Sequence, residues 1–151
     1  MVEIRKAAHR DLGAIVAMLA DDALGLSREV VSDPVDSRYE AAFAAIDADP
    51  NQLLAVVVRA DGAVIGCLQV SFIPGLSRLG LWRGQIESVR IASGERGGGL
   101  GRLMIGWAIE ECRKRGCGLV QLTSDKRREE ALRFYESLGF EATHEGFKMN
   151  L

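Results

Sequence analysis

The sequence predicts an α/β protein with a central, mostly antiparallel sheet that contains one parallel strand pair and is flanked by helices. Short apolar runs rich in β-branched residues alternate with longer segments whose apolar residues recur at helical spacing. Asp61-Gly62 joins two of these runs, as in antiparallel hairpins. A helical segment separates residues 84–91 from residues 119–123, and such strand–helix–strand units pair in parallel through a right-handed crossover. Together these observations predict one mixed sheet covered by helices.

Length and composition limit the chain to a few classes of protein. With 151 residues, of which 48% are hydrophobic, the chain is long enough for one packed core and too short for two ordinary domains, so we expect a single domain over residues 1–151. A formal net charge of −2 does not indicate nucleic-acid binding. No apolar run reaches the roughly 18 residues that a membrane span needs, and the first residues lack the order of a signal peptide. We therefore expect a cytoplasmic protein that binds neither nucleic acid nor membrane.

The first half of the chain is expected to form an edge strand, two helices and the hairpin. Apolar and charged residues alternate at the start, as in a strand at the edge of a sheet. The second helix is expected to end before Asp49-Pro50, because the residue before a proline rarely stays helical. In chain order we expect a strand at 2–6, a helix at 11–23, a loop at 25–34, a helix around 39–46, and strands at 53–58 and 64–70.

The second half is expected to alternate strands and helices. A helix that begins at Gly99 should be largely buried and should stop at Gly116 after three basic residues. A later helix is capped by Gly139. In chain order we expect a loop at 72–84, a strand at 84–91, a helix at 99–115, a strand at 119–123, a helix at 129–138, and a final strand or hairpin at 140–150 around Gly146.

The cysteines and histidines do not form a recognisable disulfide or metal pattern. Cys67, Cys112 and Cys117 are an odd number without a CxxC pair, and His9 and His144 lie far apart in the sequence. We expect plain buried or half-buried thiols and no metal site.

Residues 96–102 form a glycine-rich turn between a predicted strand and a predicted helix. A helix N-terminus presents unpaired N–H groups and the positive end of the peptide dipole, and glycines let the backbone approach an anion closely. A nucleoside-triphosphate P-loop would need G-x4-G-K-[ST], which does not occur here. A dinucleotide turn would need a glycine at Arg102 or Met104. The turn is therefore predicted to bind the phosphates of a different ligand.

The pattern Arg96-x-x-Gly99-x-Gly101 resembles motif A of the GNAT superfamily of N-acetyltransferases. The strand at 84–91 lies just upstream, as in that family, and residues 131–140 resemble its motif B helix, A-x-x-x-Y-x-x-x-G-F. Each motif alone is common, but the ordered set at these spacings is specific. The resemblance covers residues 84–140. It implies a GNAT-like acyl-CoA N-acyltransferase fold and the transfer of an acetyl group from acetyl-CoA to a primary amine.

The resemblance also implies where acetyl-CoA would bind. Backbone N–H groups of the turn would hold its pyrophosphate, and the pantetheine arm would lie along the preceding strand and hydrogen-bond like an added strand. A backbone N–H of that strand would also stabilise the oxyanion that forms when the thioester is attacked. The implied positions are Val89, Arg90 and Ile91 in the strand, and Arg96, Gly97, Gly98, Gly99, Leu100, Gly101 and Arg102 in the turn.

Two residues are expected to move protons. An alkyl amine has a pKa of about 10 and needs a base at neutral pH, and Glu87 lies on the strand that would carry the thioester. Tyr135 occupies the motif B tyrosine position, where the family commonly uses the phenol to protonate the departing thiolate. The alternatives are an exposed strand glutamate paired with arginine and a tyrosine that belongs to the core.

Arg128 stands where many family members have asparagine, seven residues before the tyrosine. It would either pair with a CoA phosphate or lie exposed to solvent, and the sequence leaves both open. The acceptor, a small molecule or a peptide amine, should be selected by residues 24–43 and by the loop at 72–82. The competing class of function is a non-catalytic module that senses acyl-CoA or regulates a partner, and a longer acyl donor also stays open. The fold is compatible with a homodimer.

Overall fold

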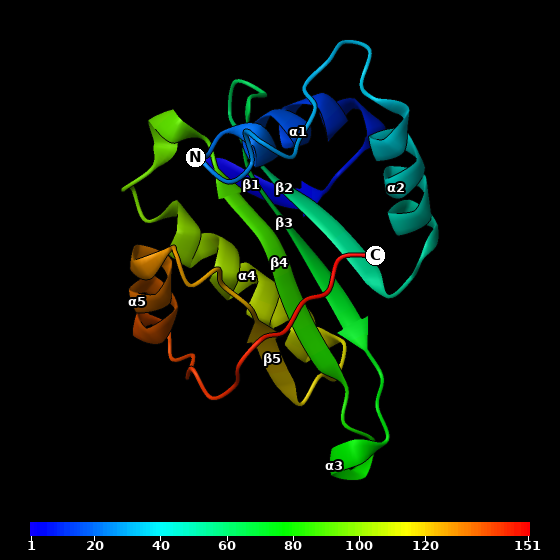
Figure 1. Cartoon of the computed structure of the whole chain (residues 1–151), viewed down its shortest axis with the longest axis vertical. Coiled ribbons are helices and arrows are strands. Elements are labelled where there is room, and N and C mark those ends of the chain that lie inside the picture. The colour runs from blue at the N-terminus through cyan, green and yellow to red at the C-terminus, as the bar shows by residue number, and fades with distance from the viewer.

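The computed structural model, which describes residues 1–151, contains one five-stranded sheet in the order β1-β2-β3-β4-β5 (Figure 1). The first four strands pair antiparallel with their neighbours, whereas β4 and β5 pair in parallel. This confirms the predicted mixed sheet with one parallel pair. The strands are β1 (Val2–Lys6), β2 (Gln52–Arg59), β3 (Val64–Ile73), β4 (Arg83–Ile91) and β5 (Leu119–Leu122).

Helices cover both faces of this sheet, and each face has its own apolar core. The helices are α1 (Leu12–Ala20), α2 (Ser37–Ala48), the short α3 (Ser77–Gly80), α4 (Leu100–Lys114) and α5 (Glu129–Ser137), with 3-10 turns at His9–Asp11 and Ser93–Glu95. In β2, Val56 packs with α1 and α2, whereas its neighbours Ala55 and Val57 pack with α4, because successive side chains of a strand point to opposite faces. None of these helices combines the length and apolar composition that crossing a membrane requires.

Two predicted element ends differ from the structure by three residues, and the other differences are smaller. The first helix ends at Ala20 instead of residue 23, because the carboxylate of Asp22 accepts a hydrogen bond from the Gly25 N–H and turns the chain away. Strand β3 continues to Ile73, two residues into the predicted loop at 72–84, since Phe72 is buried and pairs with Gly84 of β4. Pro74, one of several turn-favouring residues in that segment, comes directly after the strand.

The predicted final strand or hairpin at 140–150 is wrong. The chain after α5 has no regular secondary structure, and the apolar side chains of Phe147, Met149 and Leu151 are exposed. Alternating apolar residues form a strand only when a partner strand accepts their hydrogen bonds, and Gly146 and the polar residues around it favour β structure weakly. An ion pair of 2.9 Å between Lys126 and Glu145 links this segment to the loop between β5 and α5.

Strand β5 is shorter than β4, and part of the β4 edge is therefore left without a partner strand. Their pairing stops at Ile86 opposite Leu122, although β4 continues for five more residues (Figure 1). A bulge follows in β4, where Ser88 has a positive φ of 55° and the register with β3 shifts. Residues 87–91 therefore present a backbone edge that no strand of the chain pairs on the β5 side.

A buried ion pair joins β1 to the turn before α1. Asp11 is 3% exposed and accepts two hydrogen bonds from the Arg5 guanidinium, at 2.8 and 3.1 Å, and one from the Ala8 N–H at 2.7 Å. The hydrogen bonds from Arg5 lower the pKa of Asp11 below its ordinary value. The negative form of Asp11 is therefore favoured in the folded protein.

An Asp11→Asn variant is expected to lose about 2 kcal/mol of the free energy of unfolding, since hydrogen bonds to charged groups contribute about this much. Because the folded-state pKa is depressed, this contribution is fully present above pH about 4 and disappears as the pH falls through the folded-state pKa. Urea unfolding at pH 7 and at pH 3 checks both statements. The control is Asp47→Asn, which removes only an exposed pair with Lys6 and should cost below about 0.5 kcal/mol. Equal losses in the two variants would contradict this prediction.

Candidate active site

The glycine turn places unpaired backbone N–H groups at the start of α4. Gly97 and Gly99 have positive φ angles of 85° and 82°, and a Cβ at either position would meet no other atom, so the backbone conformation is what favours glycine there. The first bond of the helix runs from Leu103 N–H to Gly99 O at 3.2 Å. The N–H groups of Leu100, Gly101 and Arg102 therefore have no acceptor within the helix and can hold an anion.

Gly101 has a second role that the sequence did not reveal. A Cβ on this residue would lie 3.1 Å from Cζ of Phe134 and 3.4 Å from Cδ1 of Ile91. Glycine thus allows α4 to pack closely against both α5 and the end of β4. The turn, the helix that follows it and the motif B helix are held together by this contact.

The arginines that flank the turn tie it to neighbouring elements. Arg96 donates from Nε to the Ile91 carbonyl oxygen at 3.2 Å and from Nη2 to the Asp21 carbonyl oxygen at 3.4 Å. Arg102 donates to Oγ of Ser137 in α5 at 3.4 Å. The structure therefore gives both side chains a bracing role, and their contacts with a cofactor stay predictions.

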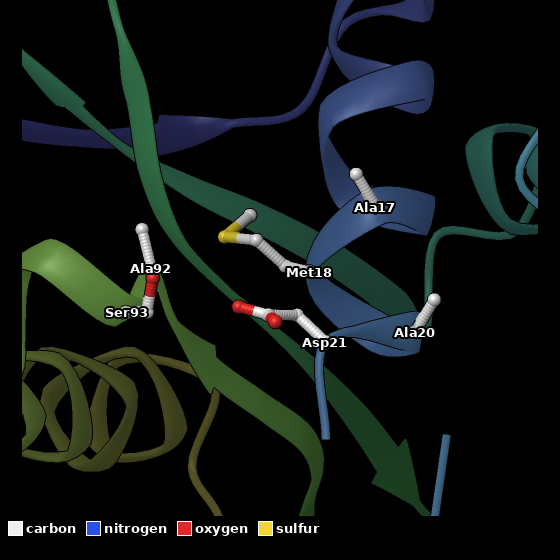
Figure 2. A pocket seen from close by; sticks show the side chains of 6 residues that line it. All are labelled: Ala17, Met18, Ala20, Asp21, Ala92 and Ser93. Atoms are coloured by element: carbon white, nitrogen blue, oxygen red, sulfur yellow. The ribbon is translucent and has the colours of Figure 1, made fainter. Parts of the chain in front are cut away.

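A shallow pocket lies between the end of α1 and the start of the glycine turn (Figure 2). Met18 and Asp21 extend from α1 toward Ala92 and Ser93, which follow β4. Neither Glu87 nor Tyr135 lines this pocket. The pocket lies at the end of β4, next to the segment that leads into the glycine turn.

The predicted site residues Arg90 and Arg128 come together around one carboxylate, that of Asp22. Arg128 donates to Oδ2 of Asp22 at 2.9 Å, and Nε of Arg90 lies 3.5 Å from the same oxygen. Burial would raise the pKa of Asp22, but the Gly25 N–H and the Arg128 guanidinium lower it below its ordinary value. Arg128 is therefore neither simply exposed nor free. It links the start of α5 to the segment after α1.

Tyr135 lies close enough to these two arginines for their positive charges to affect the pKa of its hydroxyl. Burial raises the pKa of its hydroxyl, and the positive charges of Arg90 and Arg128 partly oppose that rise. Its ring packs edge to face against Phe134 and Phe140, with centroids 5.2 and 6.0 Å away. The ring of Tyr135 thus packs against the core, which agrees with the alternative that this tyrosine is a core residue. At the same time the raised pKa keeps its proton on at neutral pH.

Glu87 lies elsewhere on β4, among polar side chains of the sheet face that α1 and α2 cover. Ser71 donates to Oε1 of Glu87 at 3.4 Å, and Gln52 accepts hydrogen bonds from both Ser71 and Gln69, at 3.0 and 2.9 Å. The Glu87 side chain is exposed, as in the structural alternative considered from the sequence, but its hydrogen-bond partner is Ser71 and not an arginine. It is free to meet a substrate from solvent.

Two further polar residues, Tyr39 and Asp125, have structural partners. The Tyr39 hydroxyl donates to Glu29 at 2.8 Å and accepts from the Val30 N–H at 2.9 Å, so it holds the loop before α2. Asp125 pairs with Arg127 at 2.7 Å. Asp22 and Ser71, by contrast, were missed as site residues. No local pattern marks them, because their roles come from contacts with residues 106 and 16 positions away in the chain.

A parallel strand pair of unequal length, a backbone edge that no strand pairs and a helix N-terminus built on glycines are the parts of an acyl-CoA-dependent acyltransferase. Residues 16–140 match the acetyltransferase (GNAT) family, and the chain belongs to that family. It is an acetyl-CoA-dependent N-acetyltransferase. The resemblance stated from motifs A and B is therefore confirmed.

Three known proteins illustrate this relationship. Aminoalkylphosphonate N-acetyltransferase of Salmonella typhimurium is 27% identical over 143 residues, which are 94% of this chain and 86% of that protein. Glucosamine 6-phosphate N-acetyltransferase of Trypanosoma brucei brucei is 36% identical over 90 residues, 60% of this chain and 59% of that protein. A crystal structure from Bacillus halodurans C-125, named a transcriptional regulator, is 48% identical with a TM-score of 0.96 and covers 100% of both chains.

Proposed function

We propose that the protein, as one GNAT-like domain over residues 1–151, transfers an acetyl group from acetyl-CoA to a primary amine by direct attack, with Glu87 as general base and Tyr135 as general acid. The observation that carries this proposal is the β4 edge at residues 87–91, which no strand pairs on the β5 side and which is followed along the chain by the unpaired N–H groups at the start of α4. An extended pantetheine arm fits such an edge, and a pyrophosphate fits such a helix start.

The proposed proton transfers follow from the chemistry of amines and thiols. Glu87 takes a proton from the ammonium form of the acceptor or from the attacking nitrogen, directly or through water, so that a lone pair can attack the thioester carbon. A backbone N–H of residues 89–91 stabilises the oxygen that gains negative charge. The carbon–sulfur bond then breaks, and the departing sulfur takes the proton of the Tyr135 hydroxyl. The phenolate regains a proton from the nitrogen as the amide forms or from water, and Glu87 returns its proton to solvent. The family and the raised pKa of Tyr135 support these roles.

A Glu87→Gln variant is expected to lower kcat at least about 100-fold, which is typical of a lost general base. The loss should be largest at low pH, because without the base only the small neutral fraction of the amine reacts. Thiol release from acetyl-CoA measures turnover over amino acids, polyamines, aminoglycosides, peptides, an aminoalkylphosphonate and an amino sugar phosphate. The control is Glu110→Gln, an exposed residue of α4 paired with Arg113, which should leave turnover unchanged. Wild-type rates at every pH would show that Glu87 is not the base.

A regulatory role is the second candidate, favoured by the name of the Bacillus halodurans structure. A sensor would bind acetyl-CoA without releasing thiol in the presence of any amine. Calorimetric binding of acetyl-CoA combined with the amine panel separates the two functions. Binding without turnover would favour regulation over the proposed transfer.

A further inference from the structure

Two positive charges next to the proposed reaction centre share a single negative partner. Arg128 and Arg90 both face Oδ2 of Asp22, while the other carboxylate oxygen accepts the Gly25 N–H. Arg28 is close enough to lower the pKa of Arg90 further, and its own partner is Glu29 at 3.6 Å. The cluster formed by Arg90, Arg128 and Asp22 therefore carries one uncompensated positive charge.

Arg90 is the member of this cluster with unused hydrogen-bonding capacity. Its side chain is only 16% exposed, and its Nη1 donates to the Val89 carbonyl oxygen at 2.9 Å. Its Nε is the single buried side-chain nitrogen or oxygen of the chain that lacks a hydrogen-bond partner. Burial lowers the pKa of the guanidinium, and the charge of Arg128 lowers it more. A buried cation with an unused donor is stabilised by an anionic acceptor.

The position of the cluster separates it from the phosphate-binding turn. Arg90 lies opposite Cys67 of β3, whose side chain belongs to the core beneath α1 and α2, whereas the turn begins α4 on the other face. The cluster also lies near the Tyr135 hydroxyl, on which Arg90 and Arg128 act electrostatically. An anion bound here would thus lie near the proposed general acid. It would not occupy the helix start proposed for the pyrophosphate.

From this arrangement we infer that the acceptor is a small amine that also carries an oxyanion group, and that Arg90 and Arg128 bind this group while the amine faces Glu87. This inference rests on the proposed function. Glu87 and Arg90 are three residues apart on β4, a span of at most about 10 Å along a strand. Amine and oxyanion must therefore belong to one short molecule. The negative charge of Glu87 and the positive cluster orient such a zwitterion in one direction along the strand.

Matched acceptors test this inference on the intact protein. The anionic acceptors are 2-aminoethylphosphonate and β-alanine, and the neutral acceptors of similar size are propylamine and ethanolamine. Wild-type kcat/KM should be at least about 30-fold higher for an anionic acceptor than for the neutral ones, as expected when a buried charge gains its partner. The better of the two anionic acceptors identifies the oxyanion as phosphonate or carboxylate.

Arg90→Gln should reduce the ratio of anionic to neutral kcat/KM by about 30-fold, chiefly through KM of the anionic acceptor. Arg128→Gln should reduce the same ratio. This variant provides the test if the Arg90 variant does not fold. Arg133→Gln, an exposed arginine of α5, is the control and should keep the ratio.

Three results would overturn the inference while leaving acetyl transfer intact. They are equal use of anionic and neutral amines by the wild type, an unchanged ratio in both variants, and a rise in KM for acetyl-CoA alone. Failure to acetylate any amine would instead contradict the proposed function and the inference together.

Discussion

A Tyr135→Phe variant is expected to lose at least about 100-fold in kcat while it binds acetyl-CoA like the wild type. The sulfur leaves as a thiolate of a thiol with a pKa of about 8.5, so a nearby proton donor lowers the barrier to its departure. Burial raises the pKa of Tyr135, and the hydroxyl therefore keeps its proton across the neutral range. Phenylalanine preserves the ring contacts with Phe134 and Phe140 and removes only this donor.

Thiol release at saturating substrates gives kcat, calorimetry gives the acetyl-CoA affinity, and thermal unfolding checks that the variant folds. The comparison variant is Tyr39→Phe, which removes the other tyrosine hydroxyl of the chain. Since that hydroxyl bonds Glu29 and the Val30 N–H, its loss should affect the loop before α2 and leave kcat far less changed. A wild-type kcat for Tyr135→Phe between pH 6 and 9 would remove the phenol from the mechanism.

An Ile105→Ala variant is expected to lower the free energy of unfolding by about 3 kcal/mol, within the range for large-to-small substitutions in a packed core. Ile105 is fully buried in the core between α4 and the sheet, together with Met104, Ala108 and Ile86. Alanine leaves a cavity there because a close-packed interior relaxes only in part. The better helix propensity of alanine offsets only a few tenths of a kcal/mol.

Leu103→Ala is the matched control on the same helix. Leu103 is 50% exposed, so its truncation should cost less than about 1 kcal/mol. Urea unfolding at pH 7 measures both variants under the same conditions. If the two losses were equal, Ile105 would not occupy the core position that the structure gives it.

Much of the fold could be predicted from periodicity and turn chemistry. The hairpin at Asp61-Gly62 and the crossover through α4 follow from local signals, and the structure confirms both. The failed prediction at 140–150 has a different cause. A strand exists only with a hydrogen-bonding partner, and alternation in one segment carries no information on whether a partner edge accepts it.

The candidate site also contains some features that local sequence patterns predict and others that they do not. Gly97 and Gly99 were predicted because a glycine-rich turn before a helix is a local sequence pattern, and the structure gives both residues a left-handed backbone. The bulge at Ser88 was not predicted, since a non-glycine residue with positive φ is imposed by strand pairing and not by its own preference. Nor was Asp22 predicted, because its partner Arg128 is distant in the sequence.

The sequence by itself determined the glycine turn, the order of elements and the family motifs, because each depends on residues close together in the chain. The tertiary structure alone decided that β4 pairs with β5 only as far as Ile86 and that Arg90 and Arg128 share one carboxylate. Both features arise from contacts between distant segments. Burial lowers the pKa of the Arg90 guanidinium, and no local pattern of residues predicts this burial.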